Sequence, residues 1–206
     1  FRYPHSPFFG HLNPISTNRI KHKNSIPNNR IQLLTIDEEN TKRQSLNMKI
    51  TSKDYMLLAL EEAHLAACRG EVPIGAVIVD PIKDEVIARD GNRTLEKNDP
   101  TAHAEIVAIR NACQKQNNFF LKGCDLYSTC EPCPMCLSAI YWAHIDNIFY
   151  ANSRADAKNI DFDDSFIYSE INKEIENRKI KMYQMHRDEA LEAFKIWDNK
   201  EDKIKY

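Results

Sequence analysis

The chain has 206 residues, of which 42% are hydrophobic and 28% are charged, and its formal net charge at pH 7 is −2. This length and composition suit one globular domain with a tail. The chain also lacks the excess of positive charge that is typical of proteins that bind a nucleic-acid backbone. No stretch approaches the roughly 20 apolar residues of a membrane-spanning helix. Neither a nucleic-acid partner nor a membrane is therefore expected.

Residues 1–47 differ in composition from the rest of the chain. They are rich in Pro, Asn and Ser, contain no acidic residue before Asp37, and show no apolar period of 2 or 3.6 residues. Their excess of Arg and Lys is also found in organellar transit peptides. Because Met48 opens a segment that reads as complete, we expect residues 1–47 to be a disordered or non-native N-terminal extension and residues 48–206 to form the domain.

Hydrophobic periodicity predicts the elements of this domain in chain order. The first is a helix over residues 53–68, with Ser52 as its N-cap and Gly70 just past its end. Strands and helices alternate after an initial hairpin, which predicts an α/β fold with helices on both faces of a central sheet. After the first helix we expect strands 74–80 and 85–89, a helix 103–116, a strand 125–129, a helix 133–144, a strand 147–151, a fifth strand 179–185, a helix 187–197 and a charged tail.

The chain contains six cysteines. It is too long and too poor in turns for a small disulfide-stapled scaffold, and two of the six stand as Cys133-x-x-Cys136. Thiolate ligands in a reducing compartment are the better interpretation, so we expect a cytoplasmic protein. The others are expected to be small buried residues, namely Cys68, Cys113, Cys124 and Cys130.

Two short segments carry a metal-binding pattern. His103 opens one predicted helix within residues 101–105 (TAHAE), and Cys133 and Cys136 open the next within residues 131–136 (EPCPMC). Imidazole and thiolate are preferred zinc ligands, and three protein ligands leave a fourth position for water. Two residues between the cysteines let both sulfurs reach one ion from a single helical turn, whose N-terminus favours negative charge. We therefore expect one Zn²⁺ per subunit.

Glu105 stands two residues after the histidine, where its carboxylate can approach a zinc-bound water without being a ligand. A lone Cys-x-x-Cys is more often structural, but a structural site would need a fourth ligand, and no second pair of Cys or His stands nearby. His-x-Glu followed by Pro-Cys-x-x-Cys is the signature of zinc deaminases. Glu105 is therefore expected to be the general acid and base.

At these residues the chain closely resembles the cytidine deaminase superfamily, and the resemblance covers essentially all of residues 51–206. It implies a three-layer α/β/α sandwich with a central five-stranded mixed sheet. It also implies that His103, Cys133 and Cys136 are the zinc ligands and that Glu105 is the proton shuttle.

Two branches of the superfamily share residues 98–105 (NDPTAHAE), the bacterial-type guanine deaminases and the tRNA adenosine deaminases. Ile74 within EVPIGA looks more like the tRNA enzymes. Residues 140–143 (IYWA), residues 162–168 (FDDSFIY) and the final Tyr206 look like guanine deaminases. The closest resemblance is thus to the bacterial-type guanine deaminases, which implies hydrolytic deamination of guanine to xanthine and ammonia.

The same resemblance implies further roles. Asp164 would be a second proton carrier, and Asn92 and Ala104 would contact the purine base. Trp142 would line the pocket, and Tyr206 would close it from a C-terminal tail swapped onto the partner of a homodimer. Without the resemblance, Asp164 and Asn92 would be turn residues, Trp142 a core residue and Tyr206 a frayed end.

Two other functions fit the same residues. A tRNA-specific adenosine deaminase would flip an anticodon base into the same zinc pocket, but it would need a basic surface, and the C-terminal region carries mixed charges. A non-catalytic zinc-stabilised binding module would close the metal site with a fourth ligand. Deamination of a small purine base is the function that the sequence favours.

Overall fold

The centre of the fold is a pair of buried strands, β1 (Gly75–Asp80) and β3 (Asp125–Cys130). In this computed structural model, which describes residues 51–205, β1 forms an antiparallel hairpin with β2 (Glu85–Gly91). β3 pairs antiparallel with β1 and parallel with β4 (Asn147–Asn152). The sheet is therefore mixed, with the strand order β2-β1-β3-β4.

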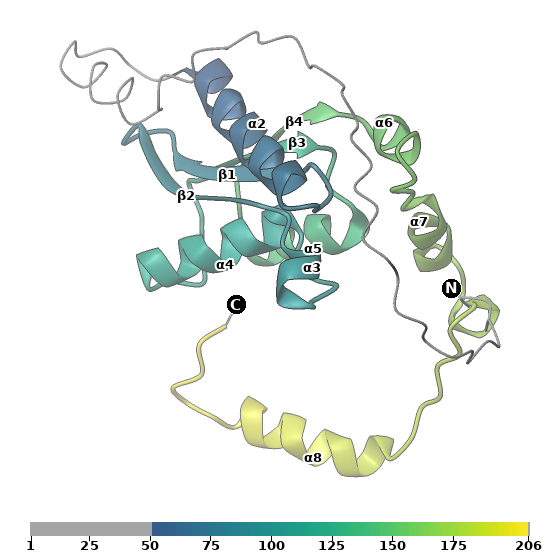
Figure 1. The fold of residues 1–206 in the computed structure, drawn as a ribbon. Coiled ribbons are helices and arrows are strands. Elements are labelled where there is room, and N and C mark those ends of the chain that lie inside the picture. The colour runs from purple at the N-terminus through teal and green to yellow at the C-terminus, as the bar shows by residue number, and fades with distance from the viewer. Residues whose placement is uncertain (1–50, 206) are drawn as a thin grey trace, which may run out of the picture. The chain divides into compact units, whose positions relative to one another are not determined.

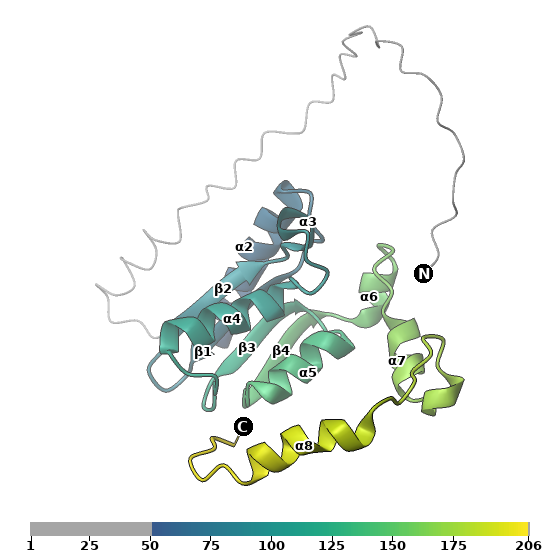
Figure 2. The same cartoon turned by 90° about the horizontal axis from the view of Figure 1, so that it is seen from below.

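Helices cover both faces of this sheet, as the sequence predicts (Figure 1). α2 (Ser52–Cys68) lies on one face, and α4 (Ala104–Gln116) and α5 (Pro134–Trp142) lie on the other, which Figure 2 shows from below. Small and β-branched side chains fill the space between the layers, and Ile78 and Leu126 are fully buried there. The predicted α/β class and its three layers are confirmed.

The first helix begins one residue earlier than the sequence predicts. Its N-cap is Thr51 rather than Ser52, because Asp54 accepts hydrogen bonds from both the backbone N–H (2.9 Å) and the hydroxyl (2.8 Å) of Thr51. The helix then packs closely on β1. A Cβ atom at Gly75 would stand 2.1 Å from the carbonyl oxygen of Ala59, so only glycine fits at this contact.

The predicted fifth strand is wrong for the part of the chain that the structure describes. Residues 179–185 form no strand, and the sheet ends at β4. An alternating apolar pattern becomes a strand only when a neighbouring strand shares its backbone hydrogen bonds, and this segment has no such neighbour within residues 51–205. Its large apolar side chains are exposed instead, namely Ile180, Met182, Tyr183 and Met185.

Several short helices were not predicted, because a helix of one or two turns is too short to show a clear apolar period. The predicted last helix is present as α8 (Arg187–Asp198) and ends one residue later than expected. No helix within residues 51–205 is both long enough and apolar enough to cross a bilayer. The helices not yet given are α3 (Thr94–Lys97), α6 (Arg154–Lys158), α7 (Ser165–Ile171) and η1 (Ile175–Asn177).

The predictions for residues 1–47 and for Tyr206 lie outside the described residues.

Candidate active site

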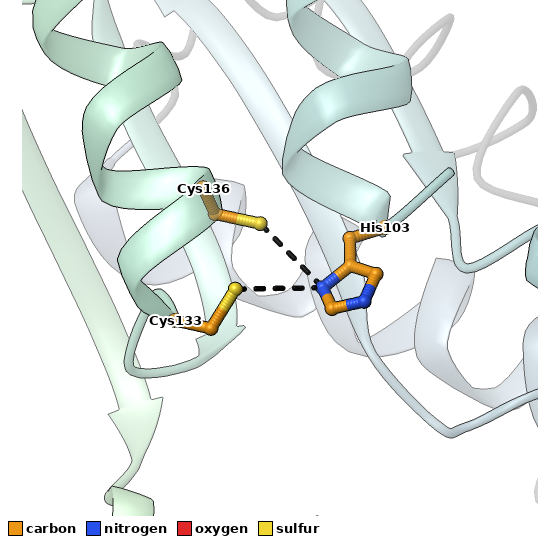
Figure 3. Close-up of side chains that lie close together, drawn as sticks. All are labelled: His103, Cys133 and Cys136. Carbon is orange, nitrogen blue, oxygen red and sulfur yellow. Dashed lines mark hydrogen bonds between the residues drawn. The ribbon is translucent and has the colours of Figure 1, made fainter. Parts of the chain in front are cut away.

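Two helix N-termini meet beside the sheet. His103 is the N-cap of α4 and Cys133 is the N-cap of α5, and both have an extended backbone, with ψ of 155° and 168°. The backbone N–H of Arg93 bonds the carbonyl of Ala102 (3.0 Å), which ties the start of α4 to the chain that leaves β2. Figure 3 shows His103, Cys133 and Cys136 reaching toward one another from the two helices.

These three side chains have the spacing of a tetrahedral metal site. The Sγ atoms of Cys133 and Cys136 each lie 3.6 Å from Nδ1 of His103, and the group has no fourth member among the described residues. Zn–S bonds of about 2.3 Å and Zn–N bonds of about 2.0 Å at tetrahedral angles place sulfur and nitrogen about 3.5 Å apart. The donor atoms and their spacing therefore fit zinc and leave one coordination position for water.

The charge state of the two cysteines favours binding of a cation. The adjacent Cys136 thiol, helped by His103, lowers the pKa of Cys133 to about 4 although burial opposes the shift. Cys133 and then burial raise the pKa of the fully buried Cys136, so its thiol keeps its proton. A divalent cation that displaced this proton would be held by two thiolates, whose charges would balance its own.

Glu105 lies beside this cluster in the first turn of α4. Its side chain is buried, its Oε1 accepts a hydrogen bond from the Ser128 hydroxyl (3.2 Å), and its Oε2 lies 3.4 Å from Sγ of Cys136. Burial, and to a smaller extent the nearby Cys133, raise the pKa of Glu105. A carboxyl group of raised pKa can both take and return a proton near neutral pH.

A small hollow adjoins the cluster, and Asp164 forms part of its wall together with His103 and Glu105. Asp164 is the N-cap of α7 and is half-buried, whereas its neighbours Asp161 and Asp163 are exposed. Burial and then Cys133 raise the pKa of Asp164, and the positive charge of Arg154 opposes them. The structure therefore sets Asp164 apart from the solvated turn residues around it.

Arg154 fastens α6 and α7 to the loop before α5. Its Nε pairs with Glu131 (3.1 Å), its backbone N–H bonds the same carboxylate (3.1 Å), and its guanidinium lies 4.4 Å from the centre of the Tyr168 ring. Tyr168 in turn donates to the carbonyl of Pro132 (3.2 Å). These contacts hold both ends of the segment that carries Asp164.

The three residues expected to contact a base lie in three different surroundings. Asn92 is 1% exposed just after β2, and its Oδ1 has no hydrogen-bond partner among the described residues. Ala104 is fully buried as the first residue of α4, so its backbone N–H lacks an intrahelical acceptor. Trp142 is 65% exposed at the other end of α5 and lines a separate apolar groove of about 830 Å³. Its contact with a substrate stays a prediction.

Two residues of the hollow were not assigned a role from the sequence. The ring of Phe162 packs on the ring of His103, with 5.6 Å between their centres. Cys130 also lines the hollow, and burial, with the nearby Glu105 as a smaller cause, raises its pKa to about 11, so its thiol is neutral. Phe162 begins the segment that carries the resemblance described above, and this was the signal that could have identified it.

Comparison with known sequences gives a family match and relatives with different coverage. Residues 49–152 match the family described as the cytidine and deoxycytidylate deaminase zinc-binding region. The guanine deaminase of Bacillus subtilis (strain 168) is 48% identical over an alignment of 153 residues, and the match covers 71% of this chain and 96% of that protein. The tRNA-specific adenosine deaminase of Agrobacterium fabrum is 55% identical over 96 residues, 47% of this chain and 62% of that enzyme. That of Buchnera aphidicola is 36% identical over 146 residues, 71% of this chain and 93% of that enzyme.

Two solved structures of guanine deaminases match this chain over different shares of their length. The X-ray structure of guanine deaminase from Bacillus subtilis matches with a TM-score of 0.73 and 44% identity, and the match covers 76% of this chain and 99% of that one. A guanine deaminase structure from Nitrosomonas europaea matches with a TM-score of 0.53 and 26% identity, over 55% of this chain and 65% of that one. The similarity to the Bacillus protein thus extends over nearly its whole length.

Proposed function

This chain belongs to the cytidine and deoxycytidylate deaminase zinc-binding family, and from that premise we propose that it hydrolyses guanine to xanthine and ammonia. The observation that carries the proposal is the similarity to a guanine deaminase over nearly the whole of that protein, in a chain whose His/Cys/Cys cluster has zinc spacing. The two tRNA enzymes match either over fewer residues or at lower identity than this guanine deaminase.

We assign the zinc to His103, Cys133 and Cys136. When bound, the ion supplies a water whose pKa is lowered toward neutrality. None of the six cysteines forms a disulfide, which agrees with thiolate ligands and with the cytoplasm as the compartment that we propose. The two helix N-termini favour the negative charge of the ligands and of the attacking oxygen.

Glu105 and Asp164 divide the proton transfers in this proposal. Glu105 takes a proton from the attacking water and returns it to a ring nitrogen beside C2 of guanine. Asp164 gives a proton to the departing amino group, which leaves as ammonia. The hydroxyl that stays on C2 loses its proton as it becomes the carbonyl of xanthine, and this proton restores the acid form of Asp164. The raised pKa of each carboxyl group supports these roles, because each group must carry a proton for part of the cycle.

We propose that Asn92 and the backbone N–H of Ala104 bind the polar edge of the base. Phe162 would pack on one face of the ring, since it already lies in the hollow beside the metal cluster. The proposed contact of Trp142 would have to be made in an assembled dimer, because within one chain Trp142 lines the separate apolar groove.

We further propose a homodimer in which the C-terminal tail packs on the partner subunit and closes its site. Two features support this proposal. No residue of α8 is buried, and its Phe194 and Ile196 are 72% and 74% exposed. β4 is an edge strand whose Tyr150 is 53% exposed. Exposed apolar side chains on a helix gain burial energy when a second surface covers them, and an unpaired edge can accept another strand.

Ammonia release tests the proposed function directly. The zinc-loaded protein is incubated separately with guanine, guanosine, adenine, cytosine and tRNA, and we expect release from guanine with xanthine as the second product. Release from tRNA alone, with binding that weakens as salt rises, would instead identify the tRNA enzyme. No release from any of the five would support the zinc-stabilised binding module.

Asp164→Asn is expected to lower kcat by about 100-fold, because an amide cannot donate a proton as a carboxylic acid does. The KM for guanine should change little, since Asp164 acts on the departing group. Steady-state kinetics with metal analysis measure both effects. Asp161→Asn is the matched control, because Asp161 is exposed and has φ of 63°, a conformation that Asn also tolerates. Equal activity of the two variants would remove Asp164 from the mechanism.

Deleting Tyr206, so that the chain ends at Lys205, is expected to lower kcat/KM by about 10- to 100-fold if the tail closes the pocket around the substrate. The mass in solution, measured by light scattering, should remain that of two chains, because α8 and the segment before it are intact. Lys205→Ala with Tyr206 kept is the control. A truncated enzyme as active as the full chain would show that the tail has no part in closing the site.

A further inference from the structure

Glu71 is a buried carboxylate outside the metal cluster, with a side chain only 5% exposed. One of its oxygens, Oε1, accepts a hydrogen bond from the backbone N–H of Glu96 (2.8 Å), and the other, Oε2, accepts one from Nδ2 of Asn92 (3.3 Å). Burial alone would raise the pKa of Glu71, but the backbone donors and the Asn92 amide together lower it. Glu71 is therefore ionised and can only accept hydrogen bonds.

The Asn92 amide is held in one orientation by its donors. Its Nδ2 donates to Glu71 and also to Oγ1 of Thr94 (3.1 Å), so both amide hydrogens are used. Its Oδ1 is buried, and no residue within 51–205 donates to it. Buried polar atoms in proteins nearly always have a partner. An acceptor that lacks one here is available to a bound molecule.

Backbone contacts place the segment that carries this amide next to the hollow. The backbone N–H of Asn92 bonds the carbonyl of Ile74 (2.9 Å), and Ile74 lines the hollow. The next residue, Arg93, bonds Ala102, which directly precedes His103. The unpartnered Oδ1 is thus carried by a segment that is bonded to Ile74, in the wall of the hollow, and to Ala102, the residue before His103.

We propose that Glu71 is a positioning residue that locks the Asn92 amide with Oδ1 offered to the substrate. The oxygen and the NH₂ group of an amide are nearly equal in size, so shape alone does not choose between the two orientations. An acceptor-only carboxylate makes that choice, and the site then selects a substrate with an N–H group at this place, such as a ring N–H of guanine. This inference rests on the proposed function for its substrate.

Glu71→Gln is expected to turn the Asn92 side-chain amide over, so that its NH₂ group rather than its Oδ1 faces the substrate. The shorter bond to the Glu96 backbone keeps an oxygen at that position, so the new NH₂ group faces Asn92. Two NH₂ groups cannot bond each other, and Asn92 must turn its own NH₂ toward the substrate. We expect kcat/KM for guanine to fall about 10- to 100-fold, mainly through KM, because the NH₂ group of Asn92 then faces an N–H group of the substrate and the two donors cannot bond each other.

A second substitution should repair the first. In Glu71→Gln/Asn92→Asp, the carboxylate introduced at position 92 accepts from the new amide and still offers an oxygen to the substrate, while the Thr94 hydroxyl rotates to donate. Asn92→Asp alone places two carboxylates together and should be at least as damaging as Glu71→Gln. The double variant should return to within about threefold of the wild-type KM. Glu96→Gln is the matched control, because its side chain is exposed and its backbone N–H remains.

Four proteins are compared by steady-state kinetics on guanine and by thermal unfolding without substrate: the wild type, both single variants and the double variant. Recovery of KM in the double variant, with coupling between the two sites in the unfolding midpoints, is the result expected. Additive losses would overturn the inference and leave Glu71 with a structural role. If the wild type releases no ammonia from guanine, the proposed function fails, and the coupling in the unfolding midpoints still tests the pairing of Glu71 with Asn92.

Discussion

Replacing Glu105 with Gln is expected to lower kcat by about 10²- to 10⁴-fold, the range attributed to a positioned general acid or base, while the bound zinc stays at one per chain. Gln has nearly the shape of Glu and can still accept the hydrogen bond from Ser128, so the buried site should keep its packing. What is lost is the ability to take a proton from water and to return it to the base. Glu105→Ala should show the same loss with more disturbance of the core.

Two measurements separate this chemical effect from damage to the fold. Metal analysis and the thermal unfolding midpoint should match those of the wild type for Glu105→Gln. Glu85→Gln serves as the matched control, since Glu85 is an exposed residue of β2 that pairs with Lys115 at 3.2 Å, and it should retain full activity. Turnover close to wild type in Glu105→Gln would remove this residue from the mechanism.

Cys136→Ser is expected to abolish both zinc binding and activity. Residues that only orient a metal ligand change affinity by about 10- to 100-fold, so loss of a ligand should weaken zinc binding by more than about 100-fold. Because the ion binds the folded state, its loss should also lower the unfolding midpoint, and a chelator should produce the same shift in the wild type. Metal analysis after dialysis and thermal unfolding with and without zinc measure these effects.

Cys68→Ser is the control for this experiment, because Cys68 is the exposed last residue of α2 and lies outside the metal group. It should keep one zinc per chain and the wild-type midpoint. Full activity of Cys136→Ser after complete removal of metal would contradict the assignment of the site.

The His/Cys/Cys cluster and the carboxylate beside it could be predicted because their signals are local. Cys133 and Cys136 stand within one helical turn, and His103 and Glu105 stand within another, so short segments fix the relative positions inside each pair. Residue types then indicated the chemistry, since imidazole and thiolates are ligands of zinc. Only the fold brings the two pairs together in space. The alternation of strands and helices was enough to predict a fold of this kind.

Other parts of the site depend on contacts between distant segments. In the sequence, only the family resemblance distinguishes Asp164 from Asp161 and Asp163. In the structure, Asp164 is half-buried in the wall of the hollow, whereas the other two are exposed. The acceptor of Asn92 could not be assigned from sequence either, because its orientation is decided by Glu71, which is contributed by a different segment of the chain. Such partners are brought together only by packing.

The amino-acid sequence by itself determined the α/β class, the residues of the His/Cys/Cys cluster, the adjacent carboxylate and the deaminase family, because each of these depends on residue types at short, regular spacing. The tertiary structure decided that residues 179–185 form no strand within one chain and that Trp142 lies away from the hollow. A strand needs a neighbour to share its hydrogen bonds, and a side chain contacts a site only where the packing of helices places it. Both are properties of the folded chain rather than of any local pattern.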